Sequence, residues 1–215
     1  MTARRRQPAD ARAPRPSYGV VRALPFDGDE AALVAAMRGG RADAAAAFYD
    51  RHAPSVHALV FRLMGPDAEI DDVVNDVFVR ALESMSRLRD PGALRSWVYG
   101  ITVRTVAIRF QKRSRQRWLR FMSPEDVPEV VAPAVSGELG EALREVHAIL
   151  HGMDPDERIA LLLHRVEGLS LEGAAEAAGT SVSTYRRRLA RGEAKFFARA
   201  KSRPALDSWL GEGGS

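Results

Sequence analysis

Apolar residues recur at intervals of three and four through most of the first half of this chain, which is the periodicity of amphipathic helices. Between residues 29 and 120 no alternation of apolar and polar residues is long enough to predict a strand. The pattern is interrupted at Gly39-Gly40, Gly65-Pro66 and Pro91-Gly92, which mark turns. We therefore predict four helices, at about residues 30–38, 42–64, 68–88 and 93–118.

The third of these helices has the clearest division into two faces. Its polar positions, Asp72, Asn75, Asp76 and Arg80, lie three or four residues apart and form one mostly acidic face. Its apolar positions are expected to face the core, and they are Val73, Val74, Val77, Phe78, Ala81 and Leu82.

A second helical pattern begins near residue 138, after the proline-containing stretch from Ser123 to Gly140, which has no apolar stripe. It predicts helices near 138–151, 155–167, 171–178 and 182–199. Asp154 before Pro155 is a strong helix start, and Gly168 is the expected stop of that helix. The chain is thus predicted to be all-α, with a four-helix N-terminal domain and a small C-terminal helical domain joined by a flexible linker.

The expected boundaries follow from these breaks. Residues 1–28 are rich in arginine and proline without apolar periodicity, so we expect a disordered basic arm. The domains are expected at 29–120 and 138–203, with the linker at 121–137 and a C-terminal tail at 204–215.

Charge is segregated along the chain although its net value is only +4. Residues 1–22 hold six arginines and one acid, Arg104 to Arg120 holds seven basic residues and no acid, and Arg186 to Arg203 holds eight basic residues and one acid. Conversely, Asp67 to Asp90 holds seven acids and three arginines. Such blocks favour two faces that bind a polyanion and an acidic face that binds something else, although ordinary charged helix surfaces would give a similar pattern.

Composition excludes several classes of function. The absence of cysteine rules out disulfides, thiolate zinc sites and cysteine nucleophiles. No apolar run is long enough for a membrane span, so we expect a soluble cytoplasmic protein with no direct membrane insertion. His147 and His151 are four residues apart but have no third ligand nearby, and no glycine-rich loop could cradle phosphates. We therefore expect no catalytic residue, metal or cofactor.

The segment from Leu169 to Lys195 has the pattern of a helix-turn-helix. Small alanines precede Gly179 at the turn, Ser181 can cap the second helix, and Val182, Tyr185 and Leu189 are expected to face inward. The residues then expected to face outward and read DNA in the major groove are Ser183, Thr184, Arg186, Arg187 and Arg191, with Arg188 on the flank.

Three stretches together resemble a known family. Asp71 to Arg80 (DDVVNDVFVR) is similar to its polymerase-docking helix, and Leu94 to Tyr99 (LRSWVY) to the start of its minus-10 recognition helix. Glu167 to Arg191 is similar to its minus-35 reader. The three stretches occur in the order expected for the family, and the likeness covers about residues 29–200. The chain therefore resembles the extracytoplasmic-function (ECF) group of the sigma-70 family, the promoter-specificity subunits of bacterial RNA polymerase.

The resemblance implies an alternative sigma factor. Its partners would be promoter DNA, core RNA polymerase (the clamp of the beta-prime subunit and the beta flap) and an anti-sigma factor, often membrane-anchored, that could hold the chain at the membrane. The resemblance assigns polymerase binding to Asp72, Asn75, Asp76 and Arg80. It assigns minus-10 binding to Arg95, Ser96, Arg104, Arg109, Lys112, Arg113 and Arg115. It assigns minus-35 binding to Ser183, Thr184, Arg186, Arg187, Arg188 and Arg191.

The chain also departs from the family pattern. Arg104 stands where the family commonly has an Asn that helps hold a flipped base, Ile108 where it has an Asp, and Tyr185 where it has a valine. The spacing of Trp97 favours a core role over base stacking. The alternative to a sigma factor is a stand-alone helix-turn-helix regulator whose N-terminal half dimerises or senses a signal. Such a regulator would need neither the acidic 71–80 face nor the basic 104–120 segment.

Overall fold

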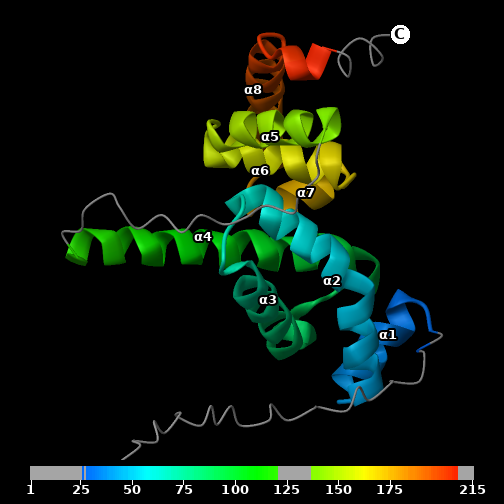
Figure 1. Ribbon diagram of the computed structural model, residues 1–215. Coiled ribbons are helices and arrows are strands. Elements are labelled where there is room, and N and C mark those ends of the chain that lie inside the picture. Colours follow the sequence, from blue (N-terminus) through cyan, green and yellow to red (C-terminus); the bar gives the residue numbers. More distant parts are fainter. Residues whose placement is uncertain (1–25, 27, 121–136, 208–215) are drawn as a thin grey trace, which may run out of the picture.

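The computed structural model describes residues 26, 28–120 and 137–207, and the elements within these residues are all helical (Figure 1). The N-terminal unit contains α1 (Glu30–Arg38), α2 (Ala42–Met64), α3 (Ile70–Ser84) and α4 (Leu94–Arg120), with the short turns η1 (Met85–Arg87) and η2 (Pro91–Ala93). The C-terminal unit contains α5 (Glu138–His151), α6 (Pro155–Leu161), the π-helical η3 (Leu162–Val166), α7 (Leu171–Ala177), α8 (Val182–Ala200) and η4 (Pro204–Leu206). The all-α prediction is confirmed. The predicted basic arm and linker lie almost wholly outside the described residues.

Local sequence explains where the C-terminal helices begin and end. The Asp154 side chain accepts hydrogen bonds from the backbone N–H groups of Asp156 and Glu157, and Ser181 caps α8 in the same way through Thr184. Gly179 has a positive φ of 65°, a conformation that costs little only without a Cβ atom. The turn between α7 and α8 is therefore encoded by residues adjacent to it.

The N-terminal core lies where α2, α3 and α4 cross, around the fully buried side chains of Phe48, Leu59, Val77 and Leu94. The prediction that Leu82 also faces this core is wrong, because 44% of its surface is exposed. It comes just before α3 ends, at the edge of the apolar stripe.

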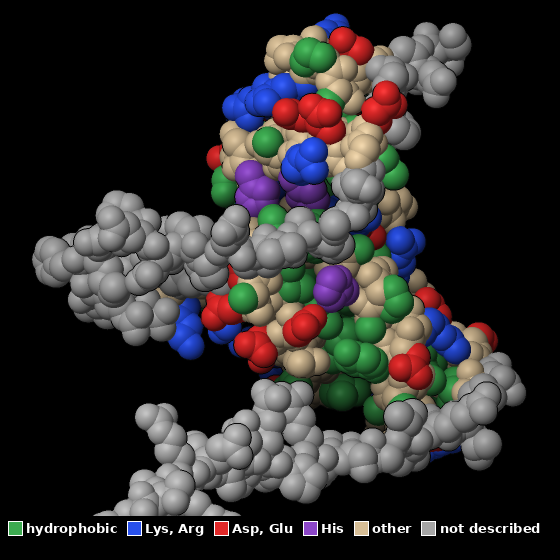
Figure 2. Space-filling view, in the orientation of Figure 1, with side chains coloured by type: hydrophobic (Ala, Val, Ile, Leu, Met, Phe, Trp, Pro, Cys, Tyr) green, Lys and Arg blue, Asp and Glu red, His purple; other side chains and the backbone are tan. Residues whose placement is uncertain are grey.

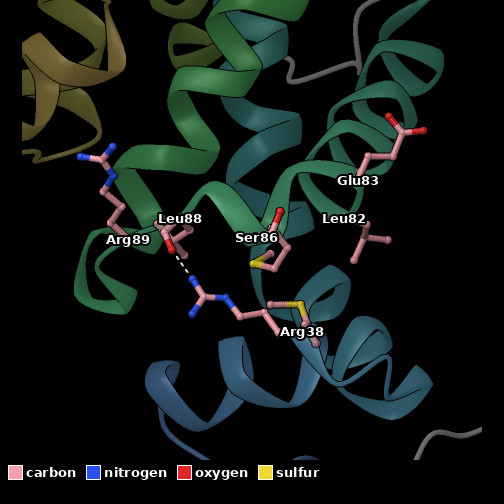
Figure 3. A pocket seen from close by; sticks show the side chains of 8 residues that line it. Arg38, Leu82, Glu83, Ser86, Leu88 and Arg89 are labelled. Carbon is pink, nitrogen blue, oxygen red and sulfur yellow. Dashed lines mark hydrogen bonds between the residues drawn. The ribbon is translucent and has the colours of Figure 1, made fainter.

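An open hollow of about 660 Å³ lies between α1 and the end of α3 (Figure 3). Leu82 and Glu83 line one side of it, and Arg38 crosses it to donate a hydrogen bond to the Leu88 carbonyl. Other lining residues are Met37, Met85, Ser86, Leu88 and Arg89.

In the C-terminal unit α6 and α8 pack face to face around Tyr185. The Tyr185 hydroxyl donates a hydrogen bond of 2.6 Å to the Ala160 carbonyl, and burial raises the pKa of this phenol. Leu206 in η4 is buried, so packed residues extend into the segment that we assigned to the tail.

The two units contact one another. α7 packs against the first half of α4, and α5 approaches the C-terminal end of α2 (Figure 1). No helix in the described part of the chain is both long and apolar enough to cross a membrane.

Candidate nucleic-acid interface

The second helix of the helix-turn-helix, α8, presents a basic face to solvent. We call the residues Ser183, Thr184, Arg186, Arg187 and Arg191 the reading face. All are exposed except Thr184, which is half-buried. The opposite side of α8 is fixed by the buried residues Tyr185, Leu189 and Gly192, the last lying against the backbone of Glu157. Because the inner side is packed, the three arginines are held together on one surface of the helix.

Arg188 is placed differently from the other predicted arginines. Its guanidinium lies 2.6 Å from a carboxylate oxygen of Asp156 in the first turn of α6, and it is only partly exposed. This ion pair joins α8 to α6. The predicted DNA contact of Arg188 would therefore compete with a contact inside the unit.

The predicted minus-10 residues all lie on α4, but the structure does not bring all of their side chains to one surface. Arg104 and Lys112 are exposed. Arg109 instead makes two hydrogen bonds to the Glu69 carboxylate, of 3.0 and 2.7 Å, and its side chain is only 20% exposed. This bidentate pair fixes α4 to the residue that precedes α3. The side chains of Arg113 and Arg115 lie outside the described residues.

Arg95 and Ser96 lie in the first turn of α4, close to the C-terminal unit. The Arg95 guanidinium is stacked 5.4 Å from the centre of the Tyr99 ring, and it lies 3.9 Å from a carboxylate oxygen of Glu167. The Ser96 hydroxyl donates a hydrogen bond of 3.0 Å to the Ala93 carbonyl. Trp97 is partly buried and packs on the core, as its spacing predicts.

Sequence reasoning missed one feature of α4. Phe110 is 36% exposed and Ile108 is 47% exposed, between the basic positions 104 and 112. Surfaces that combine aromatic and basic side chains are suited to unpaired nucleotides, because bases stack on rings while cations hold the backbone. The signal in the sequence was an aromatic residue within the basic run from Arg104 to Arg120.

The predicted polymerase-binding residues share one exposed surface of α3. We call Asp72, Asn75, Asp76 and Arg80 the acidic face, and all four are exposed. Red acidic side chains gather over this part of the N-terminal unit in Figure 2. Val79, 53% exposed, and Leu82 add apolar surface beside it. A mixed acidic and apolar surface is better suited to a protein partner than to DNA.

The described residues supply no third side chain that could complete a metal site with His147 and His151. The rings of His147 and His151 are 6.5 Å apart, and no group of three potential ligands occurs in the described part of the chain. His147 packs edge-on against Phe61 of α2. Partial burial lowers the pKa of both histidines, and nearby Arg62 and Arg158 add to the effect at His147 and His151 respectively.

Comparison with known families finds a match in each unit. Sigma-70 region 2 matches residues 48–116, and Sigma-70 region 4 matches residues 143–196. The first match contains the acidic face and the predicted minus-10 residues through Arg115. The second contains the helix-turn-helix.

Two sigma factors are at least 30% identical to this chain over their aligned residues. The ECF RNA polymerase sigma factor SigC of Mycobacterium tuberculosis is 33% identical over 132 residues, which are 61% of this chain and 70% of SigC. The ECF RNA polymerase sigma factor SigE of Mycolicibacterium smegmatis is 30% identical over 149 residues, covering 66% of this chain and 56% of SigE. The chain thus spans little more than half the length of SigE.

A solved structure shares the fold. The sigma factor RpoE of Bartonella quintana, in complex with the anti-sigma factor NepR, aligns with a TM-score of 0.61 at 23% identity, over 72% of this chain and 96% of RpoE. The order of the two matched regions and the identity to SigC show that the chain belongs to the extracytoplasmic-function group of the sigma-70 family.

Proposed function

We propose that this chain is an alternative sigma factor that binds core RNA polymerase, recognises minus-10 and minus-35 promoter elements and initiates transcription of a specific set of genes in the cytoplasm. The observation that carries the proposal is the separation of three surfaces within one chain. The acidic face on α3 suits a protein, whereas the exposed cations of α4 and the reading face on α8 suit DNA. A sigma factor is not an enzyme, so the polymerase supplies the chemistry.

Each surface has a role in this proposal. The acidic face, with Val79 and Leu82 beside it, contacts the clamp of the polymerase, and the C-terminal unit contacts the beta flap. Arg104 and Lys112 hold the phosphates of the opened minus-10 region, with Phe110 available to stack on a base. The reading face enters the major groove at the minus-35 element.

A stand-alone regulator is the less favoured function. It would use the same helix-turn-helix, but it would not require a sigma-70 region 2 over residues 48–116. We further propose an anti-sigma factor as a partner, since the related RpoE was solved with one. Such a partner could also hold the chain at the membrane.

Binding to core polymerase and promoter-specific transcription test the proposal. The purified chain is mixed with core RNA polymerase and a fragmented genomic DNA library, and new transcript starts are mapped. We expect a stable complex and starts that share upstream elements near positions −10 and −35. DNA binding without any polymerase binding would instead establish the stand-alone regulator.

A further inference from the structure

The first turn of α6 carries two consecutive acids, and each of them binds a cation of α8, the helix that bears the reading face. The Glu157 carboxylate accepts two hydrogen bonds from the Lys195 ammonium, of 2.9 and 2.6 Å. A carboxylate oxygen of Asp156 lies 2.6 Å from the Arg188 guanidinium. Arg188 and Lys195 are seven residues, or about two helical turns, apart, so both ion pairs lie along the side of α8 that faces α6.

The two ion pairs differ in what they contribute to the fold. The Glu157 side chain is buried, and Gly192 of α8 packs against the Glu157 backbone. By contrast, the Asp156 side chain is 53% exposed and that of Arg188 is 31% exposed. An ion pair that solvent reaches in this way contributes little to stability, because water and salt screen it. The packing of α6 on α8 therefore depends on the buried contacts, which include the Tyr185 hydrogen bond, and does not require Asp156.

The Asp156–Arg188 pair instead fixes the position of a positive charge beside the reading face. Arg188 comes four residues after Thr184 and three before Arg191, and these spacings make it a neighbour of both on the surface of α8. When the reading face enters the major groove, a cation on its flank lies beside the sugar-phosphate backbone. In the structure this cation is bound to a carboxylate of its own chain.

We propose that Asp156 is a positioning residue that lowers the affinity of the chain for DNA of any sequence, because it holds the Arg188 guanidinium away from phosphate. Phosphate contacts carry no sequence information, so a free Arg188 would strengthen binding to non-promoter DNA as well as to promoters. Non-promoter sites greatly outnumber promoters in a genome. Asp156 thus reduces the fraction of the chain retained on such sites and keeps it available to polymerase. The inference rests on the proposed function for the placement of the reading face in the major groove.

The salt dependence of DNA binding tests this role, because each phosphate contact adds a fixed amount to it. Asp156→Asn keeps the size of the side chain and removes its charge. Fluorescence anisotropy of a duplex of random sequence, mixed with the full-length protein, measures the association constant between about 50 and about 200 mM salt. We expect Asp156→Asn to bind about fivefold more tightly at the lowest salt. The slope of the logarithm of the association constant against that of the salt concentration should steepen by about 0.9, the value for one added phosphate contact.

A double-mutant cycle shows whether the effect passes through Arg188. In an Arg188→Ala background, Asp156→Asn should leave the slope unchanged, because no guanidinium is released. Asp207→Asn is the matched control, since it makes the same change in net charge at an exposed position in the same unit, away from α6. Equal steepening with and without Arg188, or in Asp207→Asn, would overturn the proposal, because overall charge would then explain the result.

The same measurements separate this inference from the proposed function. An unchanged slope in Asp156→Asn, with normal binding by the wild-type chain, would overturn the role of Asp156 alone. If Arg186→Ala combined with Arg187→Ala left binding to the random duplex unchanged, the reading face would not be the DNA-binding surface. That result would overturn both the role of Asp156 and the proposed minus-35 contact.

Discussion

Tyr99 and Glu167 lie 68 residues apart, in different units, and share a hydrogen bond of 2.7 Å within a buried site. Tyr99 is fully buried, and burial is the main cause that raises the pKa of its phenol. The hydroxyl therefore stays protonated and remains a donor to the Glu167 carboxylate at neutral pH. Hydrogen bonds to charged groups contribute about 1.5–3 kcal/mol to stability.

Replacing this donor should weaken the packing between the two units. We expect Tyr99→Phe to lower the free energy of unfolding by about 1.5–3 kcal/mol in urea, because the buried Glu167 carboxylate loses one hydrogen-bond donor. Tyr49→Phe is the control, since Tyr49 is 42% exposed. Equal losses in the two variants would contradict a special role for Tyr99.

The reading face should account for minus-35 recognition. We expect Arg186→Ala combined with Arg187→Ala to lower affinity for promoter DNA at least about thirtyfold, since each good contact contributes about 1–3 kcal/mol. Fluorescence anisotropy with a promoter fragment measures this, and polymerase binding should not change. Arg188→Ala should have a much smaller effect on DNA affinity because Asp156 already holds that side chain. A loss with Arg188→Ala as large as with the pair would contradict the placement of the reading face.

The acidic face should contribute to polymerase binding through its charge. Asp72→Asn with Asp76→Asn keeps the size of both side chains and removes two exposed charges, so we expect about tenfold weaker binding to core polymerase at low salt. The difference from wild type should shrink as salt is added, because exposed charges are screened. Asp207→Asn, an exposed acid in the other unit, serves as the control. Unchanged affinity in the double variant would exclude the acidic face from the polymerase contact.

The histidines between the units should make stability depend on pH. The pKa of His147 is lowered by burial and by Arg62, and that of His151 by burial, Arg158 and His147. The neutral forms are therefore favoured in the packed structure, whereas unfolded histidines titrate near pH 6.5. As the pH falls below about 6.5 the unfolded chain takes up protons more readily, and the folded, packed state loses stability.

A substitution separates His147 from the other histidines. In His147→Phe the slope of unfolding free energy against pH, measured by urea denaturation between pH 5 and 7, should fall by up to about 1.4 kcal/mol per pH unit. The aromatic contact with Phe61 can be kept, and no hydrogen bond is lost at Nδ1, which has no partner. His57→Phe is the control, because the His57 side chain is exposed. An unchanged slope in His147→Phe would contradict the prediction.

The sequence predicted the local structures that depend only on residues close together along the chain. Asp154 and Ser181 cap their helices as predicted, and Gly179 forms the turn of the helix-turn-helix, because caps and turns are completed within a few residues. The inward position of Tyr185 likewise follows from helical spacing.

Contacts between distant segments could not be predicted in the same way. Arg109 belongs to a basic run, and nothing in that run indicates that Glu69, 40 residues earlier, binds it. Leu82 continues an apolar stripe, but the stripe does not tell where the neighbouring helix stops covering it. Glu167 fits the helix-turn-helix pattern, which gives no sign of donors in the other unit.

The absence of a side chain at Gly100 allows α4 and α7 to pack closely. A Cβ atom there would press on the Ala177 backbone at 3.2 Å, and that backbone can yield only if α7 moves away from α4. One methyl group at this position would weaken the packing of α7 on α4 while leaving the acidic face and the reading face untouched. The volume of a single side chain therefore sets how closely the two units pack, independently of the residues predicted to contact DNA.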